Sequence, residues 1–492
     1  MRPFAGFAIL LLAVGVSVTP RAQARDVPPW EAFLATASAD RAQSAAAIEA
    51  IAAGWRKGYA GMVVDVARFL PSPIRRPTEE SLVALPDAVG DPGAPIRDPA
   101  PSPTLLPPGA ETRRRLTRLL EEKTGQRYGD DLRAWRRWIW SQPYAPHPGY
   151  AAFKAALYAQ IDPGFRRFFP ADARATIRLD EIDWGGVGVN GIPPLRSPAT
   201  IPAADARWLR DDHVVFGIVI NGSARAYPKR ILAWHELALD QLGGVDLTIV
   251  YCTLCGTVIP YDSRLGGRRF TFGTSGLLYR SNKLMFDDET GSLWSSLEGT
   301  PVVGPLVNQG LRLTFHPVVT TTWGEWTREY PSTTVLSIET GHARDYSEGA
   351  AYRDYFASDR LMFEVPVRDD RLRNKDEVLV LRSEFIGAGQ PPVAIAVDRL
   401  KRNSTFTFTA GGRGFVVVTT AGGANLMYDS GGHAFDRRLV DRHLRDGKGR
   451  MWTVTVEALV GEAGERLPRV PAHRAFWFGW IAQHPTTTLI RQ

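Results

Sequence analysis

Apolar residues recur along the chain at two different spacings, and the spacing changes near Ile177. Over residues 25–70 and 110–142 the apolar positions are three and four residues apart, which is the period of an amphipathic helix. A further helix is predicted over 150–161 (YAAFKAALYAQI). From Ile177 onward, short runs of β-branched and aromatic residues alternate with Gly and Asn-Gly turns, as in β-strands. The pattern therefore predicts an α+β protein, with a helical N-terminal region followed by a β-rich part.

Prolines crowd residues 71–109, inside the helical region. Proline removes a backbone donor and blocks helix formation, so this segment is predicted to be an exposed linker. The stretch that follows, LLEEKTGQRYGDDLRAWRRWIW, resembles one unit of an α-helical repeat of the HEAT type. That resemblance implies a surface for a protein partner on the helical region, which we place at residues 25–172.

The β-rich part contains one sequence pattern twice. YDSRLGG (261–267) matches YDSGG (428–432), and TTWGEWTREYPSTTVLSI aligns without a gap with RAFWFGWIAQHPTTTLI. This alignment pairs Trp323 with Trp477, Trp326 with Trp480, Pro331 with Pro485, and Thr333 with Thr487. Repetition of this kind predicts two tandem copies of one β-rich α+β domain. The first copy covers 173–345 and the second covers 376–492, with a connection over 346–375.

The N-terminus has the composition of an export signal. Arg2 precedes an apolar run over residues 4–18, and Ala22-Gln23-Ala24 fits a cleavage site. We therefore expect residues 1–24 to be removed and the protein to be periplasmic or secreted, with no transmembrane segment after cleavage. The formal charge of +7 falls by two, to +5, when Arg2 and Arg21 leave. The remaining arginines are scattered, so the composition does not indicate nucleic-acid binding.

The chain has two cysteines, and they form one motif. Cys252 and Cys255 stand as C-x-x-C at the end of an apolar strand, followed at once by Gly256. Two cysteines are too few for a disulfide scaffold. In the second copy the matching positions are Thr419 and Gly422, and Asn403 lies near the position that matches His235. Loss of these groups beside retained packing residues indicates a functional role, although the copies could also have diverged under different partners.

Several longer motifs surround the cysteines. They include DEIDWGGVGVNGIPPL, ARAYPKRILAWHE, YCTLCGTVIPYDS, FGTSGLLYRSNKLMFDDETGSLW, RDYSEGAAYRDYF and the terminal AFWFGWIAQHPTTTLI. Through these motifs the chain resembles the domain-of-unknown-function 3179 family of exported bacterial and archaeal proteins, over about residues 150–492. The resemblance implies export and a conserved Cys-x-x-Cys turn, and it implies no settled activity.

Three chemistries suit the cysteine motif. Thiolate and thioether ligands select copper(I), and imidazole also binds copper. This interpretation uses Cys252, Cys255, His235 and Met285 as ligands, with Glu236 bracing the imidazole. It rests on a helix predicted over KRILAWHELALDQ (229–241) that presents His235 to the sulfurs. The alternatives are a thiol–disulfide oxidoreductase with catalytic Cys252 and Cys255, and a binding module whose cysteines form a structural disulfide.

Overall fold

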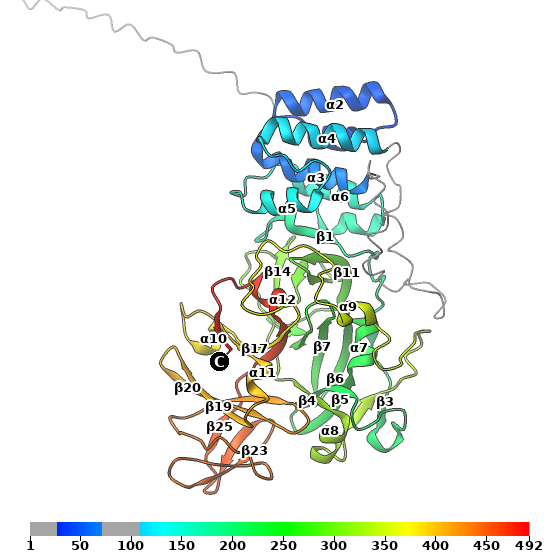
Figure 1. The fold of residues 1–492 in the computed structure, drawn as a ribbon. Helices are drawn as coiled ribbons and strands as arrows, with labels where there is room; N and C mark the ends of the chain where they lie inside the picture. The colour runs from blue at the N-terminus through cyan, green and yellow to red at the C-terminus, as the bar shows by residue number, and fades with distance from the viewer. Residues whose placement is uncertain (1–26, 71–108, 492) are drawn as a thin grey trace, which may run out of the picture.

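The computed structural model describes residues 27–70 and 109–491, which form a helical part followed by a β-rich part (Figure 1). This order agrees with the α+β prediction. The predicted signal peptide and all but the last residue of the proline-rich segment 71–109 lie outside the described residues. In the part that is described, no helix is long and apolar enough to cross a membrane.

In the described residues of the helical part there are six α-helices, and they are held by local capping as well as by packing. Asp40 caps one helix by accepting hydrogen bonds from the N–H groups of Ala42 and Gln43, and Asp131 caps another by accepting from Ala134. The helices are α1 (Trp30–Ala35), α2 (Arg41–Ala53), α3 (Ala60–Phe69), α4 (Gly109–Thr124), α5 (Leu132–Trp140) and α6 (Tyr150–Tyr158).

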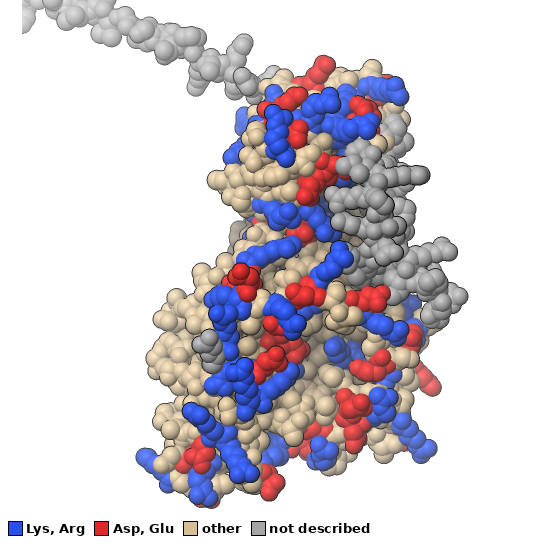
Figure 2. Space-filling model, viewed as in Figure 1, with Lys and Arg blue, Asp and Glu red and all other residues tan. Residues whose placement is uncertain are grey.

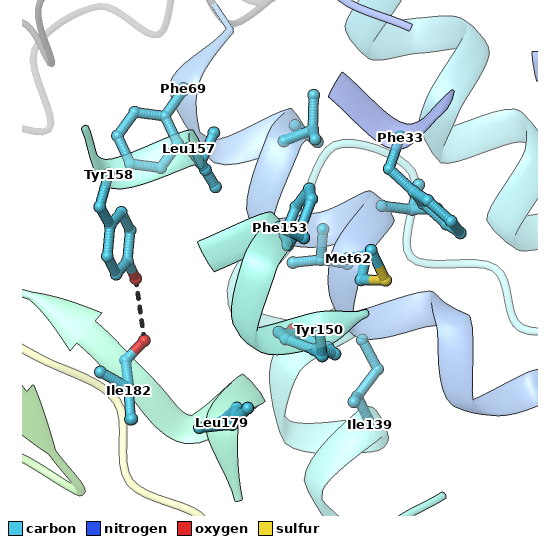
Figure 3. Packing of buried hydrophobic residues seen from close by; sticks show 14 of the residues in the cluster. Phe33, Met62, Phe69, Ile139, Tyr150, Phe153, Leu157, Tyr158, Leu179 and Ile182 are labelled. Atoms are coloured by element: carbon cyan, nitrogen blue, oxygen red, sulfur yellow. Dashed lines mark hydrogen bonds between the residues drawn. The ribbon is translucent and has the colours of Figure 1, made fainter. Parts of the chain in front are cut away.

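The helices pack directly on the first sheet of the β-rich part. This sheet has the order β1 (Ile182–Trp184), β11 (Phe272–Tyr279), β12 (Asn282–Asp287), β13 (Leu293–Ser295) and β14 (Thr300–Val303). Phe153 of α6 and Phe286 of β12 belong to one buried cluster. The hydroxyl of Tyr158 donates to the carbonyl of Ile182 at 3.0 Å (Figure 3). The hydrophobic core therefore runs across residue 173, where the sequence pattern places a domain boundary.

A second sheet carries the cysteine motif. Its order is β2 (Leu195–Arg196), β6 (Leu237–Leu242), β7 (Val245–Cys252) and β8 (Thr257–Asp262). The helix α7 (Lys229–His235) ends before β6. The prediction of a helix over 229–241 is thus wrong after His235. Glu236 adopts a left-handed conformation with φ of 55°, which ends the helix, and Leu237–Leu242 pairs with β7 as an antiparallel strand.

Two further sheets share the order of their first four strands. The first is β15 (Val319–Thr322), β4 (Val214–Ile220), β5 (Ser223–Pro228), β16 (Thr334–Leu336) and β3 (Thr200–Pro202). The second is β26 (His473–Phe476), β17 (Glu377–Leu381), β18 (Val393–Ala396) and β27 (Thr488–Ile490). In both, the first two pairings are antiparallel and the third is parallel.

The helices that join these strands repeat the same hydrogen bond. In α8 (Trp323–Glu329) the indole N–H of Trp326 donates to Thr333 Oγ1 at 3.0 Å. In α12 (Trp477–Ile481) the indole of Trp480 donates to Thr487 Oγ1, also at 3.0 Å. All four tryptophans that the sequence alignment pairs are buried. The two segments that align without a gap therefore build the same local structure.

The rest of the β-rich part consists of antiparallel sheets and short helices. The sheets are β19 (Thr405–Ala410), β20 (Arg413–Thr419) and β21 (Asn425–Asp429); β22 (His443–Arg445), β23 (Met451–Val454), β24 (Ala458–Gly461) and β25 (Arg466–Pro468); and the pair β9 (Arg264–Leu265) and β10 (Arg268–Arg269). The helices are α9 (Arg353–Ala357), α10 (Ser383–Ile386) and α11 (Val397–Leu400). Basic and acidic side chains are interspersed over the face shown in Figure 2.

Candidate functional site

The two cysteines lie in the tight turn that joins β7 to β8. Cys252 is the last residue of β7, and the N–H of Cys255 donates to the carbonyl of Cys252 at 3.1 Å. This bond closes a β-turn, in which the first and fourth Cα atoms are less than about 7 Å apart. Gly256 follows with φ of 62°, and a Cβ there would lie 3.0 Å from the Phe476 ring. The turn therefore requires glycine both for its backbone conformation and for this close approach.

Three distant segments enclose the thiols, which are both free and are 4% and 1% exposed. The Cys255 thiol donates to the carbonyl of Ser281, in the turn between β11 and β12, at 3.1 Å. Gly479 of α12 lies so close that a Cβ on it would come within 3.0 Å of the Cβ of Cys255. The hydroxyl of Tyr355 in α9 donates to the carbonyl of Leu254 at 2.8 Å.

A buried ion pair lies beside the thiols. Lys283 Nζ is 3.2 Å from Glu236 Oε2 and donates to the Glu236 carbonyl at 2.9 Å. Tyr352 completes the group by donating to Glu236 Oε1 at 3.1 Å. Glu236 and Lys283 are 6% and 4% exposed. Glu236 also holds a left-handed backbone, which costs a non-glycine residue about 1–3 kcal/mol. Strain and buried charge are concentrated at one place, which is typical of functional sites.

The surroundings of the two thiols affect their pKa values in opposite directions. Burial opposes ionisation of Cys252, but a hydrogen bond with Cys255, a bond from the Lys283 backbone N–H and the Lys283 charge outweigh it and lower the pKa. Burial raises the pKa of Cys255 well above its ordinary value, and the bond with Cys252 and the Cys252 charge raise it further. Cys252 is therefore the thiol that ionises first, and Cys255 keeps its proton.

The two ring nitrogens of His235 form hydrogen bonds with residues other than the cysteines. Its Nδ1–H donates to the carbonyl of Pro193 at 2.8 Å, and its Nε2 accepts from the hydroxyl of Tyr346 at 2.5 Å. Burial lowers the pKa of His235 to about 4, so the ring is neutral at physiological pH. Because both nitrogens are occupied, the expectation that a ring nitrogen faces the sulfurs is wrong. The left-handed turn at Glu236 presents the glutamate, not the histidine, to the thiol pair.

Met285 packs away from the cysteines. It is fully buried in β12, paired in register with Trp294, and belongs to a different hydrophobic cluster from Cys252 and Cys255. Within residues 27–70 and 109–491, no three His, Cys, Asp or Glu side chains are grouped so that they could hold a metal ion. The four-ligand set of the sequence interpretation is therefore not assembled here, whereas the two thiols are adjacent.

A small cavity of about 30 Å³ adjoins the ion pair. Its polar wall contains Glu236, Lys283, Tyr352, Thr274 and Ser275, and glycines and apolar residues that include Leu254 form the rest. Sequence reasoning missed the roles of Lys283 and Tyr352. The signal for them was present, because each stands in one of the long motifs that carry the family resemblance, SNKLMFDD and AAYRDYF.

One comparison with known proteins found a match. A family model described as "Protein of unknown function (DUF3179)" matches residues 189–487, more than half of the chain. No curated protein and no solved structure matches the chain. The cysteine turn and all the side chains that surround it, from Glu236 to Gly479, fall within the matched range.

Proposed function

We propose that this chain, which belongs to the DUF3179 family, is an exported redox protein whose Cys252–Cys255 pair alternates between a dithiol and a disulfide. The observation that carries the proposal is the placement of two free thiols in one closed turn, beside a buried lysine–glutamate ion pair. A structural disulfide has no need of a neighbouring buried charge pair, whose desolvation is costly. Reversible thiol chemistry uses such a charge pair, because the reaction moves charge and protons.

The two thiols have separate roles in this proposal. Cys252, whose thiolate the Lys283 charge favours, is the attacking sulfur. Cys255 keeps its proton until the second step, in which its sulfur attacks Cys252 and closes the disulfide. Glu236, whose charge acts on both thiols, would accept the proton that leaves the pair.

Equilibration with redox buffers tests the proposal. We expect the purified protein to exchange between dithiol and disulfide in mixtures of reduced and oxidised dithiothreitol or glutathione, with a midpoint above about −300 mV. Alkylation followed by mass spectrometry reads the state of the two thiols. Met285→Leu is the matched control, because it changes a buried sulfur outside the turn. A pair that stays oxidised throughout this range would be a structural disulfide and would refute redox cycling.

Copper(I) binding is a second candidate, and the adjacency of the two thiols favours it. Thiolates are soft ligands that select copper(I), and the Lys283 ammonium would offset the charge of a copper bound between two of them. This form of the hypothesis needs Cys252 and Cys255 alone, since His235 and Met285 have other contacts. Elemental analysis of protein purified anaerobically distinguishes it. Copper lost in Cys252→Ser but retained in Met285→Leu would support it.

We also propose that residues 173–345 and 376–492 arose by duplication of one unit. The shared strand order and the repeated tryptophan–threonine bonds support this proposal. The second unit has Thr419 and Gly422 where the first has its cysteines, so the turn folds without thiols. It follows that Cys252→Ser, Cys255→Ser protein should fold with little loss of stability, measured by urea denaturation, while losing its redox response.

A further inference from the structure

We propose that a cleft of about 450 Å³ beside the β9–β10 hairpin binds a small polar molecule that carries a phosphate group or several carboxylates. Its wall contains Arg196, Arg264 and Arg269, and we call it the basic cleft. The volume lies in the range of about 300–1,000 Å³ that is typical of small-molecule sites. This site is independent of the proposed redox function, because Cys252 lies at the opposite end of β7, about 20 Å from Asp246 along an extended strand.

The turn of the β9–β10 hairpin sets two of the arginines side by side. Gly266 and Gly267 have positive φ values of 59° and 76°, as in the two-residue turns that join antiparallel strands. This turn fixes a register in which Arg269 is directly opposite Arg264. Like charges in directly opposite positions on neighbouring strands destabilise a sheet. A bound anion would remove this repulsion.

A buried carboxylate orients the same two arginines. Asp246 of β7 is 5% exposed, and its Oδ2 accepts a hydrogen bond from Nε of Arg264 at 2.6 Å. Its Oδ1 lies 3.3 Å from Nη2 of Arg269. Within the described part of the chain, Asp246 is the acceptor that these two guanidinium groups contact. A guanidinium has several N–H donors, so most of the donors on this oriented pair remain available to a ligand.

The charges of the cleft wall do not balance. Asp246 offsets the charge of one of the two hairpin arginines. The other acid of the wall, Asp240, pairs with Arg225 outside the wall, with 2.6 Å between Oδ2 and Nη1. Arg196 contacts Asp288 at 3.5 Å, and both side chains are at least 40% exposed, so this ion pair contributes little. The wall therefore has an excess of positive charge, which an anion would balance.

The composition of the wall indicates the class of ligand. Planar guanidinium groups match the paired oxygens of phosphate and carboxylate groups. Ser197 and Thr271 add hydroxyl-bearing side chains to the wall, and Leu239 and Leu247 add apolar ones. The three arginine side chains are 42%, 60% and 61% exposed, so the cleft is open to solvent. A phosphorylated sugar or a small polycarboxylate has the charge and the polar body that this wall would bind.

Isothermal titration calorimetry at fixed ionic strength tests the proposal. The probes are glucose 6-phosphate, inorganic phosphate and citrate, and glucose is the neutral control. We expect at least one anion to bind with a Kd of about 1 mM or lower and glucose not to bind. Binding of glucose 6-phosphate alone would support an organic phosphate, binding of citrate alone a polycarboxylate, and equal binding of both phosphates free phosphate. If none of the three anions binds, the proposal is wrong.

Arginine variants locate the binding. Arg264→Gln and Arg269→Gln should each raise the Kd at least about tenfold, the lower range for loss of a hydrogen bond to a charged group. Arg264→Lys keeps the charge but loses the planar fork, and it should also bind more weakly. Arg210→Gln is the matched control, because Arg210 is 68% exposed and lies outside the cleft wall, and it should leave the Kd unchanged. Urea denaturation checks that each variant is folded. An anion that binds both glutamine variants as tightly as the unaltered protein would overturn the proposal and leave the redox function standing.

Discussion

The Glu236–Lys283 ion pair allows a quantitative test of the site. Lys283→Met removes the ammonium and leaves the Glu236 carboxylate buried, and Glu236→Gln does the reverse. At 3.2 Å and an effective dielectric constant of about 20, the two charges attract each other by about 5 kcal/mol. Breaking a buried pair by removing one partner typically costs about 3–5 kcal/mol. We expect each single variant to be destabilised by about that amount.

The double variant gives the coupling between the two residues. With both charges gone, no unpaired charge is left, so the loss for Glu236→Gln, Lys283→Met should be well below the sum of the single losses, by about 3 kcal/mol. Urea denaturation of all four proteins, followed by tryptophan fluorescence, measures the cycle. The pair Arg210 and Asp212 is the control, since both are more than two-thirds exposed and should couple by less than about 1 kcal/mol. If the stability loss of the double variant equalled the sum of the two single losses, the charges of Glu236 and Lys283 would not be coupled as proposed.

The same variants should move the pKa of Cys252 in opposite directions. The Lys283 charge lowers that pKa and the Glu236 charge raises it, so Lys283→Met should raise it and Glu236→Gln should lower it. The pH dependence of iodoacetamide labelling, read at Cys252 by mass spectrometry, follows the thiolate directly. Shifts of the same sign in both variants would show that a general loss of structure, and not the local charge, controls the thiol.

Three further predictions follow from the fold and the site. Gly256→Ala should lower the free energy of unfolding by about 1–2 kcal/mol because of the left-handed backbone, and further because the added Cβ would crowd Phe476. Gly222→Ala is the control: its backbone is also left-handed, but nothing lies within 4 Å of the added Cβ, so only the backbone cost should appear. Urea denaturation compares the two variants. Burial holds the pKa of His235 near 4 in the folded protein, against an ordinary value of 6.5. The free energy of unfolding should therefore be unaffected by this group above pH 6.5 and should fall by about 3 kcal/mol as the pH is lowered to 4, because the unfolded chain takes up the proton first. His235→Gln should remove this change from the stability–pH curve. Deletion of residues 27–172 should expose the apolar face of the sheet around Phe286 and yield a fragment that binds a hydrophobic dye or precipitates; a soluble, cooperatively folding fragment would show that the core can be divided at residue 173.

The sequence predicts the order of helices and strands because apolar periodicity reports which face each segment buries. It also locates the cysteine turn, because an apolar strand, two cysteines and a glycine form a local signal. It does not predict where α7 ends. The run after His235 continues a helical spacing as well as it alternates, and the antiparallel pairing of Leu237–Leu242 with β7 decides between them.

The partners of the thiols could not be predicted from local pattern. Lys283, Tyr352 and Gly479 reach the turn from a strand, a loop and a helix that lie 31 to 227 residues further along the chain than Cys252. A histidine on a helix and a methionine before an acidic run look like ligands when only residue types are considered. In the structure, the His235 ring forms hydrogen bonds with Pro193 and Tyr346, and Met285 pairs in register with Trp294.

The enclosure of Cys252 and Cys255 by Gly479 has a consequence for synthesis and folding. Gly479 follows Cys252 by 227 residues, so the thiols cannot be sheltered until the chain has been made as far as α12. Until then the pair is open to oxidants and other thiols in its surroundings. Shelter of the pair would thus be acquired when α12 docks, and a mixed disulfide formed before that step would keep α12 from docking.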